Sequence, residues 1–384
     1  MSKKAVVAGL ICLDVIPEID HHIDLQPGRL YEVGKAMMVT GGAVSNTGLA
    51  LHILGQPVLL MGKLGDDSFG QSILSIVQQY GPELKQGFKV CPGESSSYSL
   101  VINIPGVDRM FLHSPGANAT FNADDLNYAA LSDAALFHFG YSSLMAGFYS
   151  HGGQQLLEMF RRVKDLGVTT SLDPAMPDDK GPAGQVDWPV VMSKLLPLVD
   201  IFMPSADELL YLLEKTNYGQ GDELSPAEVS RLGGKMLSLG VAVAAIKLGK
   251  RGLYVRTAGR ARLEKMGRAL PSAVQAWADR ELWFPIFQEE KFMGATGSGD
   301  TTIAGFLTSL LRNADPETAG TFACAVGACN VESPGALGGI RSWDETQARI
   351  SRGWAKVRFA VQDCGWTETP EHFWRGPNDA ANRK

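Results

Sequence analysis

Apolar segments of strand length alternate with amphipathic helical segments along most of this 384-residue chain. A run of small and β-branched residues at 5–9 comes first, and a helical pattern over 42–54 follows it and ends at Gly55. Further strand-length segments lie at 57–62, 134–140, 167–173, 200–204 and 241–248. Further helical segments lie at 66–80, 154–166, 189–198 and 226–239. Because strands that alternate with helices pair in parallel, the pattern predicts an α/β fold with a doubly wound, mostly parallel sheet and helices on both faces.

Two segments, 30–40 and 97–112, alternate polar with apolar side chains and belong to no strand–helix unit. A period of two predicts antiparallel strands outside the main sheet, and we expect them to form a small β-sheet lid from about 15–40 and 95–115. Residues 254–287 are a mixed segment rich in Arg and Trp, which we treat as an insertion of unknown structure. We expect one domain over residues 1–365, followed by a polar and loosely held C-terminal tail at 366–384.

Composition and charge limit the kinds of molecule that we expect this protein to bind. The chain carries 35 basic and 41 acidic residues, a formal net charge of −6, and so lacks the positive charge that binds nucleic acid or an anionic membrane. No stretch approaches the ~18 apolar residues of a membrane-spanning helix. The five cysteines form no CxxC pair, and this small odd number favours a reducing compartment. We therefore expect a cytoplasmic protein with no nucleic-acid or membrane partner.

The strongest chemical signal is the sequence Gly-Ala-Thr-Gly-Ser-Gly-Asp at 294–300, which leads into an apolar helical pattern over 301–311. A glycine-rich turn at a helix start is an anion site, because free amides and the positive end of the helix dipole meet there. Asp300 would repel a bound phosphate unless it takes a proton from a hydroxyl that attacks the phosphate. The alternative is that Asp300 only caps the helix.

Two weaker signals lie near the N-terminus. Gly41 and Gly42 precede a helix and permit close approach of a ligand, and Asn46 in the first helical turn is placed to hold a hydroxyl. Asp14 follows the first strand, and open α/β sheets bind ligands at the carboxyl ends of their strands. The alternatives are a simple loop with Ser45 as a cap, and an aspartate that only stabilises a turn.

The order of these motifs resembles the ribokinase-like carbohydrate kinase (PfkB) family from about Lys4 to Ile350. The matching blocks are Asp14, Gly41-Gly42 with Asn46, Lys63-Leu-Gly-Asp-Asp-Ser-Phe-Gly70, Ser205-Ala-Asp-Glu208, Lys247-Leu-Gly-Lys-Arg-Gly252 and Gly297-Ser-Gly-Asp300. The resemblance implies a single ribokinase-like domain with a β-sheet lid. It also implies an ATP-dependent sugar kinase that transfers the γ-phosphate of ATP to a carbohydrate hydroxyl with the help of Mg²⁺.

Each motif then takes a role from the family. The resemblance makes Asp300 the catalytic base, places Gly297, Ser298 and Gly299 in the anion hole, and gives Glu208 a role toward magnesium through water. The expected nucleotide-binding residues are Lys247, Gly249, Gly252 and Asn330. The expected sugar-binding residues are Asp14, Gly41, Gly42 and Asn46. For Lys247, surface charge near a turn is an equally good explanation.

Some residues differ from the family's motifs, and the sequence does not identify the molecule that accepts the phosphoryl group. Gly294 and Ala295 replace an Asp-Thr pair whose aspartate helps to bind a monovalent cation, so potassium activation is left open. Ser205 replaces the asparagine of the Asn-x-x-Glu motif. A nucleoside kinase and a non-catalytic sugar- or nucleotide-binding protein are the alternative functions.

The resembled family often forms dimers through its lids. We therefore expect a homodimer that buries Leu100, Ile102 and Ile104, or the opposite face with Val101.

Overall fold

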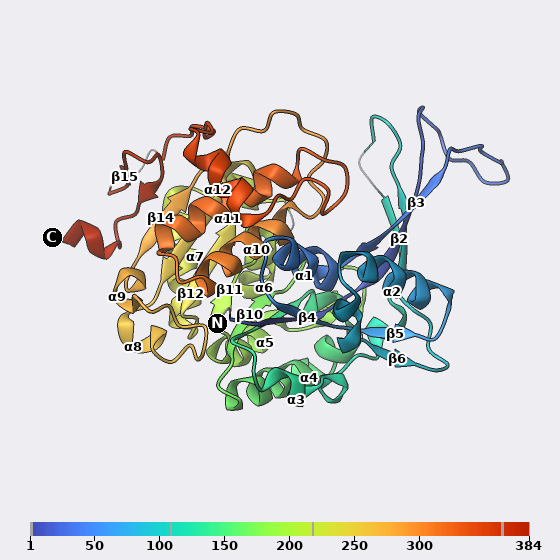
Figure 1. Ribbon diagram of the computed structural model, residues 1–384, viewed down its shortest axis with the longest axis horizontal. Coiled ribbons are helices and arrows are strands. Elements are labelled where there is room, and N and C mark those ends of the chain that lie inside the picture. The colour runs from blue at the N-terminus through green and yellow to red at the C-terminus, as the bar shows by residue number, and fades with distance from the viewer. Residues whose placement is uncertain (1–2, 108–109, 217–218, 362–364, 384) are drawn as a thin grey trace.

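The computed structural model describes residues 3–107, 110–216, 219–361 and 365–383, and the centre of this described part is a ten-stranded sheet (Figure 1). Across the sheet, the strands are β15 (Thr367–Glu368), β16 (Trp374–Arg375), β14 (Glu281–Phe284), β13 (Leu253–Thr257), β12 (Val243–Lys247), β11 (Ile201–Phe202), β10 (Thr169–Asp173), β9 (Leu136–Gly140), β1 (Ala5–Gly9) and β4 (Val58–Met61). The pairs from β12 to β4 are parallel, whereas those from β12 to β15 are antiparallel.

Strand β1 shows how the sequence leads to two covered faces. Ala5 and Val7 belong to one hydrophobic core, and Val6 and Ala8 belong to another on the opposite face. All four are fully buried. Successive side chains of a strand point to opposite faces, so only a sheet covered on both sides can bury a continuous apolar run. The predicted doubly wound, mostly parallel fold is confirmed.

Helices cover both faces of the sheet. One face carries α1 (Ala43–Ile53), α2 (Ser68–Tyr80), α8 (Arg260–Leu263), α9 (Val274–Trp277), α10 (Ser298–Leu311), α11 (Pro316–Asn330) and α12 (Trp343–Ser351). The other face carries α3 (Tyr128–Leu131), α4 (Ala146–Asp165), α5 (Trp188–Leu195), α6 (Ala206–Glu214) and α7 (Pro226–Ser238). Within the described ranges, no helix combines the length and apolarity needed to cross a membrane.

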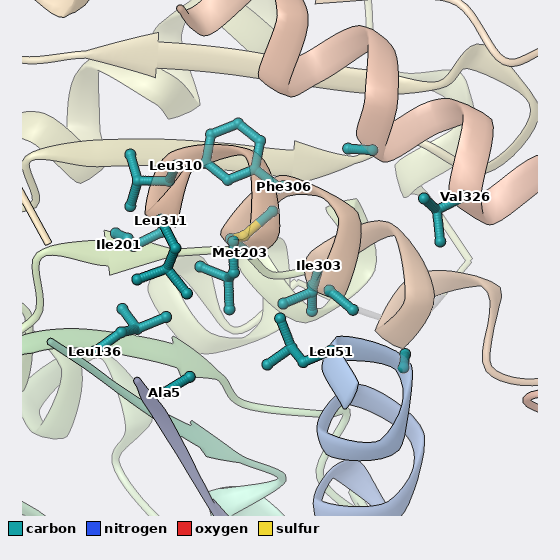
Figure 2. Close-up of a cluster of buried hydrophobic side chains, with 14 of the residues drawn as sticks. Ala5, Leu51, Leu136, Ile201, Met203, Ile303, Phe306, Leu310, Leu311 and Val326 are labelled. Atoms are coloured by element: carbon teal, nitrogen blue, oxygen red, sulfur yellow. The ribbon is translucent and has the colours of Figure 1, made fainter. Parts of the chain in front are cut away.

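Helix α10 lies at the centre of its face. Ile303 and Phe306 pack in the same cluster as Ile201 of the sheet (Figure 2). Gly305 lets α11 approach closely, because a Cβ atom there would lie 2.9 Å from the Cα atom of Ala323. Burial on all sides fixes the position of this helix, and therefore of the glycine-rich turn at its start.

A separate four-stranded sheet projects from the body of the molecule (Figure 1). Its strands, in spatial order, are β3 (Ala36–Gly41), β2 (Cys12–Pro17), β7 (Tyr98–Ile102) and β8 (Met110–Ser114). This sheet is the small sheet predicted outside the main one. One pairing differs from the expectation of antiparallel strands, because β2 runs parallel to β7. A short parallel pair, β5 (Lys63–Gly65) and β6 (Lys89–Cys91), lies between β4 and β7 in the sequence.

The structure of the C-terminal part of the chain bears on two expectations. At the ends of segment 254–287, β13 and β14 continue the main sheet in antiparallel pairing, and α8 and α9 lie between them. The tail is not loosely held, because β16 pairs with β14 and β15 pairs with β16. Trp366 and Phe373 are buried, and the fully buried carboxylate of Asp379 pairs with Arg280 at 3.0 Å. A few apolar residues in a polar tail were enough to dock it on the open edge of the sheet.

Candidate active site

The glycine-rich turn forms the start of α10. Gly297 precedes the helix in a left-handed conformation with φ 73°, and a Cβ atom there would lie only 2.6 Å from the Cβ atom of Ala336. Ser298, Gly299 and Asp300 form the first helical turn, where backbone N–H groups have no intrahelical partner. Free amides and the positive end of the helix dipole meet at this turn, which is the geometry that suits a bound anion.

The carboxylate of Asp300 does not cap the helix, because Gly297 occupies the N-cap position and no side chain bonds there. It is 5% exposed and accepts hydrogen bonds from other elements. Asn46 Nδ2 donates to it at 3.1 Å, Thr47 Oγ1 at 3.3 Å, and Tyr141 Oη lies 2.9 Å from both of its oxygens. Burial raises the pKa of Asp300, although Lys247 and these three donors oppose the shift. A carboxylate held in this way is suited to accept a proton.

A buried charge cluster lies beside Asp300. The ammonium group of Lys247, at the end of β12, pairs at 2.9 Å with Asp173, at the end of β10. Burial alone would lower the pKa of Lys247, but Asp173, Glu208 and Asp300 outweigh it and raise that pKa. Burial, with Glu208 and Asp300, raises the pKa of Asp173 to about 7 against the pull of Lys247. The charges of three carboxylates therefore act on one ammonium group, and Asp173 pairs with it directly.

Lys247 also reaches the anion-binding turn. A Cβ atom on Gly299 would lie 3.5 Å from Cδ of Lys247 and 3.6 Å from its Nζ. A fixed positive charge therefore sits next to the amides of Gly297–Gly299, where a phosphate would be held. This placement favours the nucleotide role predicted for Lys247 over that of a solvated surface charge.

Glu208 lies in the first turn of α6 and completes a capping box with Ser205. The Ser205 amide donates to Glu208 Oε2 at 2.6 Å, and the Glu208 amide donates to Ser205 Oγ at 3.3 Å. Across the described ranges, no three His, Cys, Asp or Glu side chains are grouped as a ready metal site. The carboxylates of Glu208 and Asp173 fit magnesium as hard oxygen donors acting with the nucleotide phosphates, since Mg²⁺ keeps several waters and takes few protein ligands.

The predicted sugar-binding residues lie where the four-stranded sheet of β3, β2, β7 and β8, here called the lid sheet, meets α1. A Cβ atom at Gly41 would collide with the carboxylate of Asp14, so glycine is required for this approach. Burial raises the pKa of Asp14, whose carboxylate accepts a hydrogen bond from Cys12 Sγ at 3.3 Å. Gly42 begins α1 with φ 86°, and Asn46 one turn later bonds to Asp300. Helix α1 thus links this cluster to Asp300.

A cavity of about 550 Å³ adjoins the glycine-rich turn. Its lining includes Lys247, Gly249, Gly252, Ser298 and Gly299. Its apolar lining includes Ile286, Phe287, Ala328, Val331 and Val357. Asn330 is not among the lining residues, and its Nδ2 atom instead donates to the carbonyl of Thr296 at 2.8 Å. Asn330 therefore stabilises the glycine-rich turn through a hydrogen bond to its backbone.

The sequence analysis missed three residues of this site. Tyr141 and Asp173 follow or end the adjacent parallel strands β9 and β10, and Thr47 follows Asn46. The rule that pointed to Asp14, a polar residue at the carboxyl end of a strand, also applies to Tyr141 and Asp173. Applying it to every strand would have found both residues. No comparable signal singled out Thr47.

Comparison with known proteins identifies the family. A family model described as "pfkB family carbohydrate kinase" matches residues 2–343, and the chain belongs to this family. Among curated relatives, the probable fructokinase-3 of Arabidopsis thaliana is 29% identical over 209 residues, which cover 54% of this chain and 57% of that relative. The chain thus matches a little over half of the length of that relative.

Solved structures confirm the fold. Arabidopsis thaliana ribokinase, solved in complex with ribose and ATP, has a TM-score of 0.69 at 19% identity and covers 91% of this chain and 98% of its own. A Burkholderia thailandensis nucleoside kinase, solved in complex with inosine, has a TM-score of 0.64 at 20% identity, with 91% and 98% covered. At these identities the likeness shows the ribokinase fold and leaves the substrate open.

Proposed function

We propose that the protein is an ATP-dependent sugar kinase that transfers the γ-phosphoryl group of ATP to a hydroxyl group of a carbohydrate. The observation that carries this proposal is the position of Asp300. Its buried carboxylate lies in the first turn of α10, beside an anion-binding turn and a cavity of about 550 Å³. Family membership and the ATP-bound ribokinase neighbour support the same activity.

The residues supply what phosphoryl transfer asks of a protein, which is alignment and charge stabilisation. Asp300 removes the proton from the acceptor hydroxyl as its oxygen bonds to the γ-phosphorus and the bond to the ADP oxygen breaks. The amides of Gly297, Ser298 and Gly299, with the ammonium group of Lys247, hold the charge on the transferring group. Magnesium, when bound with ATP, neutralises phosphate charge, and Glu208 and Asp173 are the residues that would hold it, through water.

The acceptor is placed on the side of Asp300 that faces α1. Asp14, Gly41, Gly42 and Asn46 supply hydrogen-bonding groups for sugar hydroxyls. The curated fructokinase relatives favour a free sugar as the acceptor. The inosine-bound neighbour favours a nucleoside as the second candidate, because a nucleoside also presents a ribose hydroxyl.

The test is a screen of ATP consumption with magnesium against a panel of fructose, ribose, glucose, adenosine and inosine. We expect ADP to form with at least one sugar and the rate to collapse in an Asp300→Asn control. Turnover with a nucleoside alone would replace the sugar by the second candidate. ATP binding without turnover of any acceptor would favour the non-catalytic binding protein.

We also propose a homodimer formed through the lid sheets. Large apolar side chains are exposed along the outer lid strands, namely Met37, Met38, Met110, Phe111 and Leu112. Because successive side chains of a strand point to opposite faces, these residues expose apolar surface on both faces of the sheet, and exposed apolar surface of this kind marks an interaction site. The residues named from the sequence are less exposed than these side chains, because Val101 and Ile104 are buried and Leu100 and Ile102 are half-buried.

We propose the cytoplasm as the place where the protein acts, and the four described free cysteines support this proposal.

A further inference from the structure

One wall of the nucleotide-sized cavity comes from outside the family match. The match ends at residue 343, whereas Val357 lines the cavity together with Ile286 and Phe287. We call residues 354–359 the strap. The strap follows α12 and pairs in antiparallel orientation with segment 286–288, which precedes the glycine-rich turn in the sequence.

Backbone hydrogen bonds hold the strap in register. Lys356 forms an antiparallel bridge with Phe287. The amide of Val357 donates to the carbonyl of Ile286 at 2.8 Å, and the amide of Gln288 donates to the carbonyl of Ala355 at 2.9 Å. These bonds fix which strap residue faces the cavity, because side chains of an extended segment alternate between its two sides.

A buried arginine anchors the strap to both segments that flank the glycine-rich turn. The guanidinium group of Arg349 lies 3.5 Å from the centre of the Trp354 ring. It also pairs with Glu290 at 3.0 Å and with Glu332 at 2.6 Å. Glu290 precedes the turn in the sequence, and Glu332 follows Asn330, which stabilises the turn through a hydrogen bond to its backbone. The strap is thus tied to the same framework as the anion-binding site.

The strap is a single layer with space on either side. A second cavity of about 610 Å³ lies behind it, and Phe287 and Val357 line both cavities. Arg358, the next residue, lines only the second cavity and is exposed. Val357 and Arg358 belong to neither main hydrophobic core, so their side chains can be changed without opening those cores.

We infer that the strap is the nucleobase-recognition element of this protein, with Val357 and Phe287 contacting the base of a bound purine nucleoside triphosphate. The inference rests on the proposed kinase function. Lys247, Ser298 and Gly299 in the cavity lining match the triphosphate, and Ile286, Phe287 and Val357 in the same lining offer apolar contacts to the flat faces of the base.

Two ligands and a matched pair of variants test the inference by calorimetry. Val357→Trp fills the base end, and we expect it to weaken ATP binding at least tenfold while leaving the affinity for inorganic tripolyphosphate within twofold of wild type. Arg358→Trp, one residue along on the outer side, should leave both affinities unchanged. Val357→Ala, which only removes contact area, should weaken ATP binding about two- to fivefold and keeps the test open if the larger side chain prevents folding.

The binding measurements distinguish failure of the inference from failure of the proposed kinase function. Equal ATP affinity in wild type and both Val357 variants would overturn the inference and leave the kinase function standing. Loss of tripolyphosphate binding together with ATP binding in the folded variants would also overturn it, because Val357 would then act on the phosphate end. A wild-type protein that binds neither ATP nor tripolyphosphate would overturn the proposed function and the inference with it.

Discussion

The phenolic oxygen of Tyr141 lies 2.9 Å from both carboxylate oxygens of Asp300. Tyr141 follows β9 with φ 67°, a left-handed conformation that is costly for a bulky residue and persists where the surroundings enforce it. With Asn46 and Thr47 it surrounds the carboxylate by donors. Tyr141 is therefore a positioning residue for the proposed base.

The first prediction concerns this contact. The hydrogen bond from Tyr141 lowers the pKa of Asp300, so Tyr141→Phe should raise it. Because the base must be ionised to accept a proton, the acid limb of the kcat/KM profile should move to higher pH. On the alkaline plateau the loss should stay within about tenfold, the value of one hydrogen bond. Initial rates from pH 5 to 9 check this, with Tyr149→Phe as control. An unmoved acid limb would contradict the positioning role.

The second prediction concerns the base itself. Asp300→Asn should lower kcat by a factor on the order of 10²–10⁴, the usual value of a positioned general base. The affinity for ATP should change little, because the anion-binding amides of Gly297–Gly299 remain. Steady-state rates and calorimetric titration with ATP measure the two effects. A variant that keeps more than half of the wild-type turnover would exclude Asp300 as the base.

The third prediction concerns magnesium. Glu208→Gln removes the charge but keeps an oxygen that accepts the Ser205 amide, so the capping box should survive. We expect the magnesium concentration for half-maximal rate to rise more than the KM of the acceptor. Rates over a matrix of magnesium and acceptor concentrations separate the two. If only the acceptor KM rises, Glu208 belongs to the acceptor pocket.

The fourth prediction concerns the lid. Phe111→Asp places a charge in the exposed apolar surface of the lid sheet and should convert the proposed dimer to a monomer. Val190→Asp changes another exposed apolar residue, on α5 and far from the lid in sequence, and should leave the dimer intact. Light scattering at micromolar concentration measures both. A monomeric wild-type protein would rule out the dimer.

The fifth prediction concerns the C-terminal tail. Asp379 is fully buried and accepts hydrogen bonds from Arg280 and from the amides of Glu281 and Ala381. Asp379→Ala removes the acceptor of these groups. Because Arg280 keeps Glu317 and the carbonyl of Ala276, the donors left unpaired should cost about 1–3 kcal/mol of unfolding free energy. Glu371→Ala, at an exposed position of the same tail, should cost less than about 0.5 kcal/mol. Urea unfolding followed by tryptophan fluorescence compares the two variants.

The sequence was sufficient where local pattern and global fold agree. The apolar run of β1 could be buried only between two layers of helices, and the spacing of glycines before α10 indicated where that helix begins. The main sheet, the separate small sheet and the start of α10 were all predicted on such grounds. These features depend on the period and composition of short segments, which can be read without knowing what lies opposite.

The features that the sequence did not predict depend on contacts between residues that are far apart in the chain. Tyr141 and Asp300 are far apart along the chain, and no local pattern reveals that one holds the other. The tail looked polar, yet the unpaired edge of β14 and the buried Arg280 gave it a docking place. Val357 likewise belongs to the cavity only because the strap pairs with segment 286–288.

The pairing of β14 with β16 has a consequence for biosynthesis. Strand β14 emerges from the ribosome well before Trp374 and Arg375, so one edge of the main sheet waits with unpaired amides and carbonyls while the remaining chain is made. Such an edge recruits strands from other chains. Translation that stops before Trp374 therefore yields a species prone to aggregation, and completion of the sheet coincides with arrival of the residues that protect it.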